Sequence, residues 1–447
     1  MNSVKHTARE KKSNLSFTLF LMLAWRNLWR HKRRTLITLS SIAIGFGLSV
    51  FSIGMQDSGH NNMVKNAIYM GDGHITLQHP EYLHAPANHR FLHNGKNLLQ
   101  QLEDEQIDGQ IAPRVSLQIL VSTAHNSVGA GMQGIRVGPD SIQTDSSQVN
   151  SSQIDPLQLL LEKRITQGSW LTSDKPRGVI IGDGMARKLK AKIGSKIVII
   201  AGKKGGDSES QLARVQGIYK SGIDELDKFL IISRLDYAQK YLVAEGGIEA
   251  DEPLTRIAIF LNDDKKMEEW KKQLSDNFTT ENIAVLDWEE LLPQLVQYIV
   301  FDDMGSYIMQ FIILLVIVFG IINTVLMGVL ERTREFGLLR ALGMSKSGLI
   351  YMVLLETLLL SILAVIIGWA VGGSIHLYVA TYGIDFSGMI PEGTTFAGTF
   401  MDPIVYSELS SSRVIQLTGI VFLATLLSGI YPAIKASRIP PIEALKS

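Results

Sequence analysis

The chain has 447 residues, 46% of them hydrophobic, and its 43 basic side chains balance its 43 acidic ones. It contains no cysteine, which excludes disulfide bonds, thiolate metal sites and cysteine nucleophiles. A mean hydropathy above zero predicts that part of the chain lies in lipid. Because the net charge is zero, any electrostatic signal must come from the distribution of charges along the chain.

The N-terminal segment is strongly basic. Residues 1–34 carry nine basic side chains and one acidic one. Within them, residues 15–30, LSFTLFLMLAWRNLWR, combine apolar and aromatic residues with late arginines, a pattern typical of an amphipathic helix in the inner membrane interface. An ordinary cytosolic helix is the alternative. We expect residues 1–34 to form this cytoplasmic or interfacial helix.

Four stretches are long enough to cross the ~30 Å hydrocarbon core of a bilayer, which requires about 20 helical residues. They are residues 35–55, 304–330, 347–382 and 414–434. The first could be mistaken for a cleaved signal peptide. Its apolar run is longer than the ~7 to 15 residues of a signal-peptide core, and no A-x-A-like cleavage site follows it. We therefore expect it to remain as a membrane anchor.

Lysine and arginine near the spans predict the orientation, because both are enriched in cytoplasmic segments. Residues 1–34, 331–346 and 435–447 are basic, whereas residues 383–413 hold four acidic side chains against one arginine. The three basic segments, and with them both termini, are therefore expected in the cytoplasm. Residues 383–413 and 56–303 are expected on the other side of the membrane.

Residues 56–303 are expected to fold, since structureless loops beyond ~15 residues are uncommon. Apolar runs predict strands at residues 74–78, 116–123, 178–182, 195–202, 229–233 and 256–261. Helical spacing predicts helices at residues 95–106, 184–194, 265–278 and 287–295. These elements predict an extracytoplasmic α+β domain of two subdomains, with the middle third of its sequence inserted into the outer one. Residues 140–153 are expected to form a serine-rich surface loop.

The segment ERTREFGLLRALG, residues 331–343, is charged and apolar in equal measure. Glu331 can pair with Arg334 and Arg332 with Glu335 on the surface of a helix, and the apolar residues follow helical spacing. Two interpretations fit this pattern equally well. One is a short helix at the membrane surface, and the other is a helix that offers one face to a cytoplasmic partner.

The third predicted span contains one acidic residue and a glycine pattern. A carboxylate at mid-bilayer costs ~2.5 to 3.5 kcal/mol on insertion scales, so Glu356 is expected near the cytoplasmic end and paired with a nearby arginine. A proton-coupled role is the alternative. Gly368 and Gly372 form a small-xxx-small pattern, which permits close packing between helices.

Half of the histidines fall in one short segment. They are His74, His79, His84, His89 and His93. Imidazole is a common metal ligand, but a spacing of five residues turns each ring by ~140° from the last one on a helix, and Pro80 and Pro86 interrupt a helix. A polar loop is favoured and no metal site is assigned, although a folded-back loop could still gather three imidazoles.

The sequence offers no catalytic arrangement. No Ser/His/Asp set or pair of carboxylates stands out, so no catalytic residue is assigned. A phosphate-binding loop requires G-x-x-x-x-G-K-[ST], and the nearest approach, AGKKGG at residues 201–206, lacks the first glycine and the Ser/Thr after the lysine. We expect no ATPase within this chain.

Several segments resemble the permease subunits of ABC transporters in the superfamily of MacB, LolC, LolE and the more distant FtsX. They are AWRNLWRHKRRT (24–35), GVIIGDGMARKLKAKIGSKIVII (178–200), VQGIYKSGIDELDKFLII (215–232), ERTREFGLLRALG (331–343) and YPAIKASRIPPIEALKS (431–447). They occur in the order and at the spacing of that family. The layout of one span, a large external domain and three further spans also resembles these permeases.

The resemblance implies a non-catalytic, multi-pass subunit of a bacterial inner-membrane ABC transporter. It implies that residues 331–346 hold a coupling helix that docks into a groove of a separate ATPase subunit, present as a dimer. The residues carried over to that contact are Glu331, Arg332, Glu335, Gly337, Arg340, Ala341 and Gly343. ATP and Mg would be bound by the partner ATPase, and no cofactor by this chain.

The resemblance also implies a function. ATP hydrolysis by the partner would drive a conformational change outside the membrane, which extracts or exports a lipoprotein or another amphiphilic substrate. The alternative is an FtsX-like mechanotransmitting receptor that regulates an external partner without transport. Either function implies a second permease copy or a close paralogue and a periplasmic or lipoprotein partner, and neither implies a nucleic acid.

Overall fold

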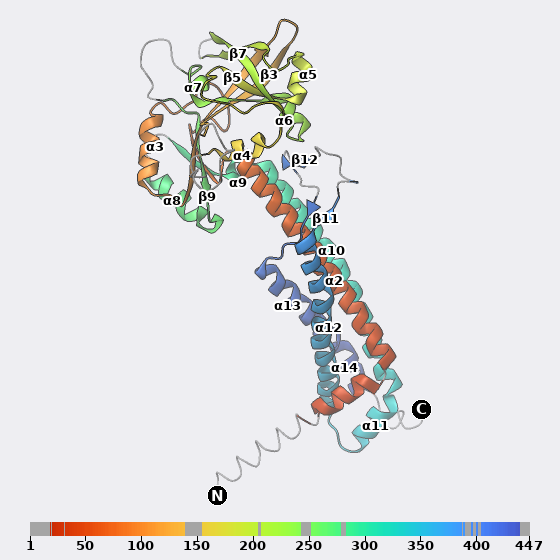
Figure 1. Cartoon of the computed structure of the whole chain (residues 1–447). Helices are drawn as coiled ribbons and strands as arrows, with labels where there is room; N and C mark the ends of the chain where they lie inside the picture. Colours follow the sequence, from red (N-terminus) through yellow and green to blue (C-terminus); the bar gives the residue numbers. More distant parts are fainter. Residues whose placement is uncertain are drawn as a thin grey trace. The chain divides into compact units, whose positions relative to one another are not determined.

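The computed structural model describes residues 18, 20–30, 32–138, 154–203, 207–242, 252–278, 283–386, 388, 395–396, 399–400 and 404–438. The chain divides into two compact units (Figure 1). The first comprises Met1–His60, Val300–Phe386 and Ile404–Ser447, and the second comprises Asn61–Ile299 and Ser387–Pro403. The predicted serine-rich loop, residues 140–153, lies outside the described residues.

Long helices build the first unit. They are α2 (Lys32–Met70), α10 (Pro293–Glu331), α12 (Lys346–Tyr382), α13 (Ser411–Ser428) and α14 (Ile430–Ser437). Residues 20–30 are also helical. In the described part of the chain, four helical stretches are long and apolar enough to cross a membrane: α2, α10, α12 and the stretch Ser411–Ser437.

The helices differ from the predicted spans at three points. α2 continues beyond residue 55 to Met70, and α10 begins at Pro293, before residue 304. The fourth predicted span is divided at Gly429 between α13 and α14. A Cβ atom at Gly429 would lie 2.4 Å from the hydroxyl of Thr357 in α12, so the bare backbone at this break allows α12 to approach.

Glycines also bring α12 close to α2. A Cβ atom at Gly368 would lie 2.5 Å from the ring of Phe46, and one at Gly372 would lie 2.9 Å from the Cα of Gly47. Phe46 packs edge-on against Trp369, with 5.5 Å between the ring centroids. The two glycines therefore occupy the helix contact expected from their spacing, and a side chain at either position would separate α12 from α2.

The second unit is built on one ten-stranded sheet. Its strands are β1 (Ile75–Gln78), β2 (Gly109–Ser122), β3 (Ser127–Ile135), β4 (Ile165–Gly168), β5 (Gly178–Gly182), β6 (Lys196–Gly202), β7 (Ser208–Tyr219), β8 (Leu230–Arg234), β9 (Arg256–Leu261) and β10 (Ala284–Asp287). The order is β10-β1-β9-β2-β3-β8-β5-β7-β4, and β6 pairs with both β2 and β7. The strands from the middle of the sequence thus lie together at one end of the sheet.

This topology corrects the prediction of two subdomains. The expected insertion is present. Strands β1, β9 and β10 come from the two ends of the domain sequence and pair with one another, and the strands between them in sequence form the rest of the sheet. However, β2 has 14 residues and pairs with β9 at its first half and with β3 and β6 at its second half. One strand therefore joins both parts into a single sheet and a single compact unit.

Short helices cover this sheet. They are α3 (Gly95–Asp104), α4 (Pro156–Glu162), α5 (Asp183–Leu189), α6 (Asp224–Phe229), α7 (Leu235–Gln239), the 3-10 turn η2 (Asp264–Lys266), α8 (Met267–Phe278) and α9 (Trp288–Leu291). Two small antiparallel pairs complete the described strands: β11 (Ile384–Asp385) with β14 (Ile404–Val405), and β12 (Thr395–Phe396) with β13 (Thr399–Phe400). The main core lies between the sheet and α3, α5, α7 and α8.

Candidate functional site: the coupling segment and its anchors

The segment between the second and third candidate spans forms the helix α11 (Thr333–Ala341). A single residue, Arg332, separates α11 from the end of α10 at Glu331. Two residues after the helix, Gly343 has a φ of +99°, a conformation that glycine adopts without steric cost. Ser345 then caps α12 by accepting a hydrogen bond of 3.1 Å from the N–H of Gly348. Short, defined connections therefore fix α11 to both neighbouring helices.

Arg332 joins α11 to α12 through charged contacts. Its Nε lies 3.0 Å from a carboxylate oxygen of Glu335, and its Nη1 lies 3.3 Å from one of Glu356 in α12. The guanidinium also lies 5.2 Å from the centre of the Phe336 ring. Only 8% of the Arg332 side chain and 20% of the Glu356 side chain are exposed. The arginine partner predicted for Glu356 is thus present.

Two further pairs tie α11 and the end of α10 to the N-terminal helices. Glu335 pairs with Arg30, and Glu331 pairs with Arg34 of α2 at 2.6 Å. The predicted pair of Glu331 with Arg334 is therefore wrong, because Arg34 approaches from another helix. Burial would raise the pKa of Glu335, but the hydrogen bonds from Arg332 and Arg30 hold it below its usual value. Glu335 is a carboxylate at neutral pH.

The exposed face of α11 carries leucines. Leu338 is 53% and Leu342 is 77% exposed, whereas Phe336 and Gly337 are buried against the first unit. Arg334, Ala341 and Gly343 lie on the exposed side with the leucines. Leu338 in α11 and Leu342 directly after it are four positions apart, and both are exposed. We call this leucine-bearing surface the α11 face.

Three of the carried-over residues make contacts within the chain or are buried in it. Glu335 is held by arginines of its own chain, and the Nη1 of Arg340 lies 3.4 Å from the backbone oxygen of Ser437 at the end of α14. Gly337 is buried. The contact of Glu335 and Arg340 with a partner therefore stays a prediction. Leu338 and Leu342, which sequence reasoning passed over, lie on the exposed side of the segment.

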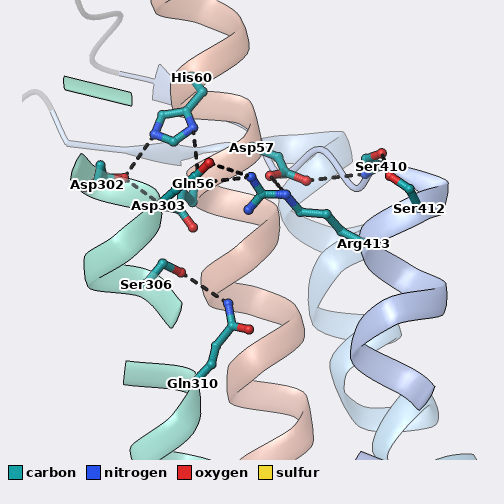
Figure 2. A network of polar contacts seen from close by, with 10 residues as sticks. All are labelled: Gln56, Asp57, His60, Asp302, Asp303, Ser306, Gln310, Ser410, Ser412 and Arg413. Atoms are coloured by element: carbon teal, nitrogen blue, oxygen red, sulfur yellow. Dashed lines mark hydrogen bonds and ion pairs between the residues drawn. The ribbon is translucent and has the colours of Figure 1, made fainter. Parts of the chain in front are cut away.

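A second group of charged side chains joins α2, α10 and α13 (Figure 2). Arg413 of α13 lies 3.2 Å from a carboxylate oxygen of Asp57 and 2.9 Å from one of Asp303. His60 lies 3.0 Å from Asp302, which also accepts a hydrogen bond of 2.8 Å from Gln56. We call these six residues the α2–α10–α13 cluster.

Sequence reasoning did not identify this cluster, although a signal was present. Asp57, Asp303 and Arg413 each lie within two residues of the end of a predicted span, but only the fold shows that these ends meet. Along α2, Arg34 and Asp57 are separated by about 35 Å at 1.5 Å per residue. This length is close to the ~30 Å hydrocarbon core of a bilayer, so charged anchors lie at the two ends of a membrane-length stretch.

In the second unit, two arginines hold the chain that follows α2. Arg114 of β2 forms a two-point ion pair with Asp155, at 2.7 and 3.1 Å, and donates a hydrogen bond to the backbone oxygen of Gly71. Arg256 of β9 pairs with Asp72 and lies 4.9 Å from the centre of the Tyr82 ring. The residues immediately after α2 are therefore fixed to two strands of the sheet.

The start of α10 is held at the same edge of the sheet. β1 pairs with β10, with Ile75 opposite Asp287, and the N–H of Trp288 donates to the backbone oxygen of His74. His74 is buried, accepts a hydrogen bond from the N–H of Leu261 and contacts Asp264 at 2.9 Å. Burial lowers the pKa of His74, although Asp264 opposes this effect.

The predicted histidine segment does not assemble a metal site in the described residues. No group of three His, Cys, Asp or Glu side chains among them is placed to hold a metal ion. His74 serves as a hydrogen-bonding residue of the sheet edge, and residues 79–93 form turns and irregular backbone.

Comparison with known proteins identifies two family domains. The FtsX-like permease C-terminal domain matches residues 307–441, and the MacB-like periplasmic core domain matches residues 35–277. The lipoprotein-releasing system transmembrane protein LolE of Haemophilus influenzae is 21% identical and covers 95% of this chain and 98% of its own length. LolC of Neisseria meningitidis is 22% identical, with 96% and 100% covered.

Other similarities are shorter. The macrolide export ATP-binding/permease protein MacB of Chlorobaculum tepidum is 32% identical over 28% of this chain and 16% of its own length. Among solved structures, the extracellular domain of the transporter YknZ covers 48% of this chain and 99% of that domain, with 16% identity and a TM-score of 0.30. The periplasmic region of MacB from Actinobacillus actinomycetemcomitans covers 53% and 97%, with 12% identity and a TM-score of 0.33. Since the MacB-like periplasmic core domain spans more than half of the chain and the FtsX-like permease domain follows it, the chain belongs to the family of ABC transporter permeases that carry a MacB-like periplasmic core domain.

Proposed function

We propose that this permease couples a separate cytoplasmic ATPase dimer to a conformational change in its extracytoplasmic domain. The observation that carries this proposal is the α11 face. Leu338 and Leu342 are exposed on a segment whose helix is held by the ion pairs of Glu335 with Arg30 and Arg332. An exposed apolar surface on a rigidly held helix is suited to receive a partner and to transmit its displacement.

The proposed transmission depends mainly on covalent continuity and packing. To change the populations of two conformations from 1:99 to 99:1, a partner must bind one conformation about 5.5 kcal/mol more tightly than the other. An exposed ion pair contributes only ~0 to 1 kcal/mol. The pairs of α11 are therefore too weak to carry the displacement alone. The single-residue connection to α10 and the packing of Phe336 carry it, while Arg332 and its partners fix the direction in which α11 can move.

We further propose that both termini lie in the cytoplasm of a bacterial cell and that the chain resides in the inner membrane. The basic segments flanking the candidate spans support this orientation. ATP and Mg would be bound by the partner ATPase and not by this chain. A second copy or a close paralogue would complete the transporter, because an ATPase dimer presents two equivalent grooves.

The proposed substrate is a lipoprotein or another amphiphile. Two relatives named for lipoprotein release, LolE and LolC, align over nearly the whole of this chain and over 98% and 100% of their own lengths. Agreement along the full length supports a shared layout of membrane and external parts. In this proposal, motion received at α11 loosens an amphiphilic molecule from the outer face of the membrane.

Co-purification of the tagged chain from membranes tests the proposal. The expected result is an ATP-hydrolysing partner that is lost when Leu338 and Leu342 are both replaced by glutamate. Burying a leucine fully stabilises a contact by ~1.5 to 3 kcal/mol, so losing both should weaken binding by about 3 kcal/mol, or roughly 100-fold.

Lys272→Glu is the matched control, because this side chain is exposed on α8. The neighbouring Lys271 is unsuitable, since it pairs with Asp287 and Glu290. Unchanged recovery of the ATPase with the double leucine variant would contradict docking at the α11 face. Retention of partner and activity in Lys272→Glu would exclude a general effect of added negative charge.

A further inference from the structure

A pocket of about 350 Å³ opens in the second unit where β5 and β7 meet the turn before β6. Its apolar lining includes Pro176, Ile193 and Val215, and the side chains of Arg177 and Arg214 lie at its edge. Ile193 is 42% exposed. The volume falls within the range of ~300 to 1,000 Å³ that is typical of small-molecule sites.

Four cations surround this pocket. Lys175, Arg177 and Arg214 line it, and Lys196 stands directly opposite Arg214 in the β6–β7 pair. Within the described residues none of the four forms an ion pair, and no acidic side chain lines the pocket. The nearby carboxylate of Asp174 accepts a hydrogen bond from Thr172 and also attracts Lys175, so Arg177, Arg214 and Lys196 are the cations left for an anion. Like charges directly opposite each other destabilise a strand pair, so a bound anion would relieve repulsion built into this sheet.

A buried polar group also lines the pocket. Gln216 is 6% exposed and lies at a β-bulge, where the β5–β7 register shifts between Val179 and Ile180. Its amide nitrogen donates to the backbone oxygen of Trp170 at 2.6 Å, but its carbonyl oxygen has no partner among the described residues. An orphaned buried acceptor costs ~1 to 3 kcal/mol. This oxygen is enclosed by the protein, so Gln216 contributes to the floor of the pocket and is not assigned a ligand contact.

We propose that this pocket binds an anionic amphiphile. The acyl chain lies against Pro176 and Ile193, and the anionic head group lies between Arg177 and Arg214. This inference rests on the proposed function, because it takes an amphiphile as the substrate and assigns a binding site for it outside the membrane. Glycerophospholipids and acylated peptides both combine an acyl chain with an anionic group, and the experiment distinguishes these two kinds of ligand.

Photocrosslinking of the full-length chain tests the site in the absence of any ATPase. The chain is placed in phosphatidylcholine nanodiscs with lysophosphatidylglycerol that carries a diazirine in its acyl chain. The expected result is crosslinking to peptides from residues 175–178, 193–194 and 214–216. Unlabelled lysophosphatidylglycerol should compete, and zwitterionic lysophosphatidylcholine should compete at least ten-fold less well. A parallel arm with a diazirine-bearing N-palmitoyl peptide carboxylate identifies the preferred source.

Paired variants distinguish a specific site from general attraction to the membrane. Replacing Arg177 and Arg214 by glutamine should reduce crosslinking at least ten-fold, and Ile193→Asp should do so while all the cations remain. Arg187→Gln removes an exposed cation of α5 and should have no effect. Equal competition by the zwitterionic lipid, or labelling spread evenly over the domain in both arms, would overturn the site. Because no ATPase is present, this failure would leave the coupling proposal untouched, and an uncoupled Leu338/Leu342 variant should still bind the lipid.

Discussion

Asp155→Asn should strongly destabilise the extracytoplasmic domain. The carboxylate forms a two-point contact with Arg114, and the two side chains are only 2% and 1% exposed. Asparagine keeps the shape of the side chain and can still cap α4, where Asp155 accepts the N–H of Leu157 at 2.9 Å. The substitution therefore removes the charge and presents an amide nitrogen to one N–H of the guanidinium, while the helix cap remains.

The expected magnitude follows from the burial of Arg114. Removing one partner of a buried ion pair costs about 3 to 5 kcal/mol, because the other charge is left uncompensated. In a domain of this size each kcal/mol lowers Tm by roughly 2 to 4 °C, so the expected decrease is roughly 6 to 20 °C. Arg187→Gln is the control, since its pair with Asp183 lies on the surface and contributes about 0.3 to 0.5 kcal/mol.

Circular dichroism of purified residues 61–299 during heating measures both variants. This segment forms most of the second compact unit and holds its main hydrophobic core. A decrease for Asp155→Asn no larger than that for Arg187→Gln would refute the reasoning. It would mean that Arg114 reaches water or another acceptor, and that the chain after α2 is held by packing instead of by this pair.

Three further predictions concern packing, pH and orientation. Gly372→Leu should destabilise the full-length protein in detergent by ~1 to 3 kcal/mol, because a Cβ atom there meets the backbone of α2. Gly373→Leu should destabilise it less, because a Cβ atom there meets only the Trp369 ring, at 3.6 Å. Equal destabilisation by the two variants would contradict the helix contact. Because burial lowers the folded-state pKa of His74 below 6.5, the stability it contributes is complete above pH 6.5 and falls as the pH falls. When the pH is lowered from about 7.5 to about 5.5, the Tm of wild-type residues 61–299 should therefore decrease more than the Tm of the His74→Gln variant. Equal decreases would contradict the predicted direction of the His74 contribution. In the cysteine-free chain, an impermeant thiol reagent should label Ser208→Cys in intact spheroplasts and Ser347→Cys only after lysis; the reverse pattern would invert the proposed orientation.

The sequence predicted most of the apolar strands but not the polar or glycine-rich ones. β5 and β9 match their predicted limits, because continuous apolar runs end at clear charge or glycine signals. β3, with the sequence SVGAGMQGI, contains three glycines and no sustained alternation. β7 begins with polar residues and becomes apolar only in its second half. Their strand structure depends on pairing partners, β2 for β3 and β6 for β7, which are set by the tertiary fold.

The coupling segment shows the same limit at the level of side chains. Helical spacing predicted α11, and the cost of a buried charge predicted an arginine partner for Glu356. The spacing could not tell which apolar face is buried, because α11 carries Phe336 and Leu339 on one side and Leu338 and Leu342 on the other. Nor could it place Arg34 beside Glu331, since that pair joins residues about 300 positions apart in sequence. The need for an arginine beside Glu356 was predictable, but the particular residue that pairs with each carboxylate was not, because it depends on how the helices pack.

The central claim is that displacement of α11 reaches the extracytoplasmic domain. Hydrogen exchange with mass spectrometry, applied to the complex with its ATPase in the presence and absence of ATP and Mg, tests it directly. The account predicts a nucleotide-dependent difference in residues 61–299 of the wild-type chain. In Phe336→Ala, which removes the buried packing of α11 but keeps Leu338 and Leu342, the ATPase should remain bound and active while that difference disappears. A difference that persists unchanged in Phe336→Ala, or that is absent from the wild-type complex, would contradict the account.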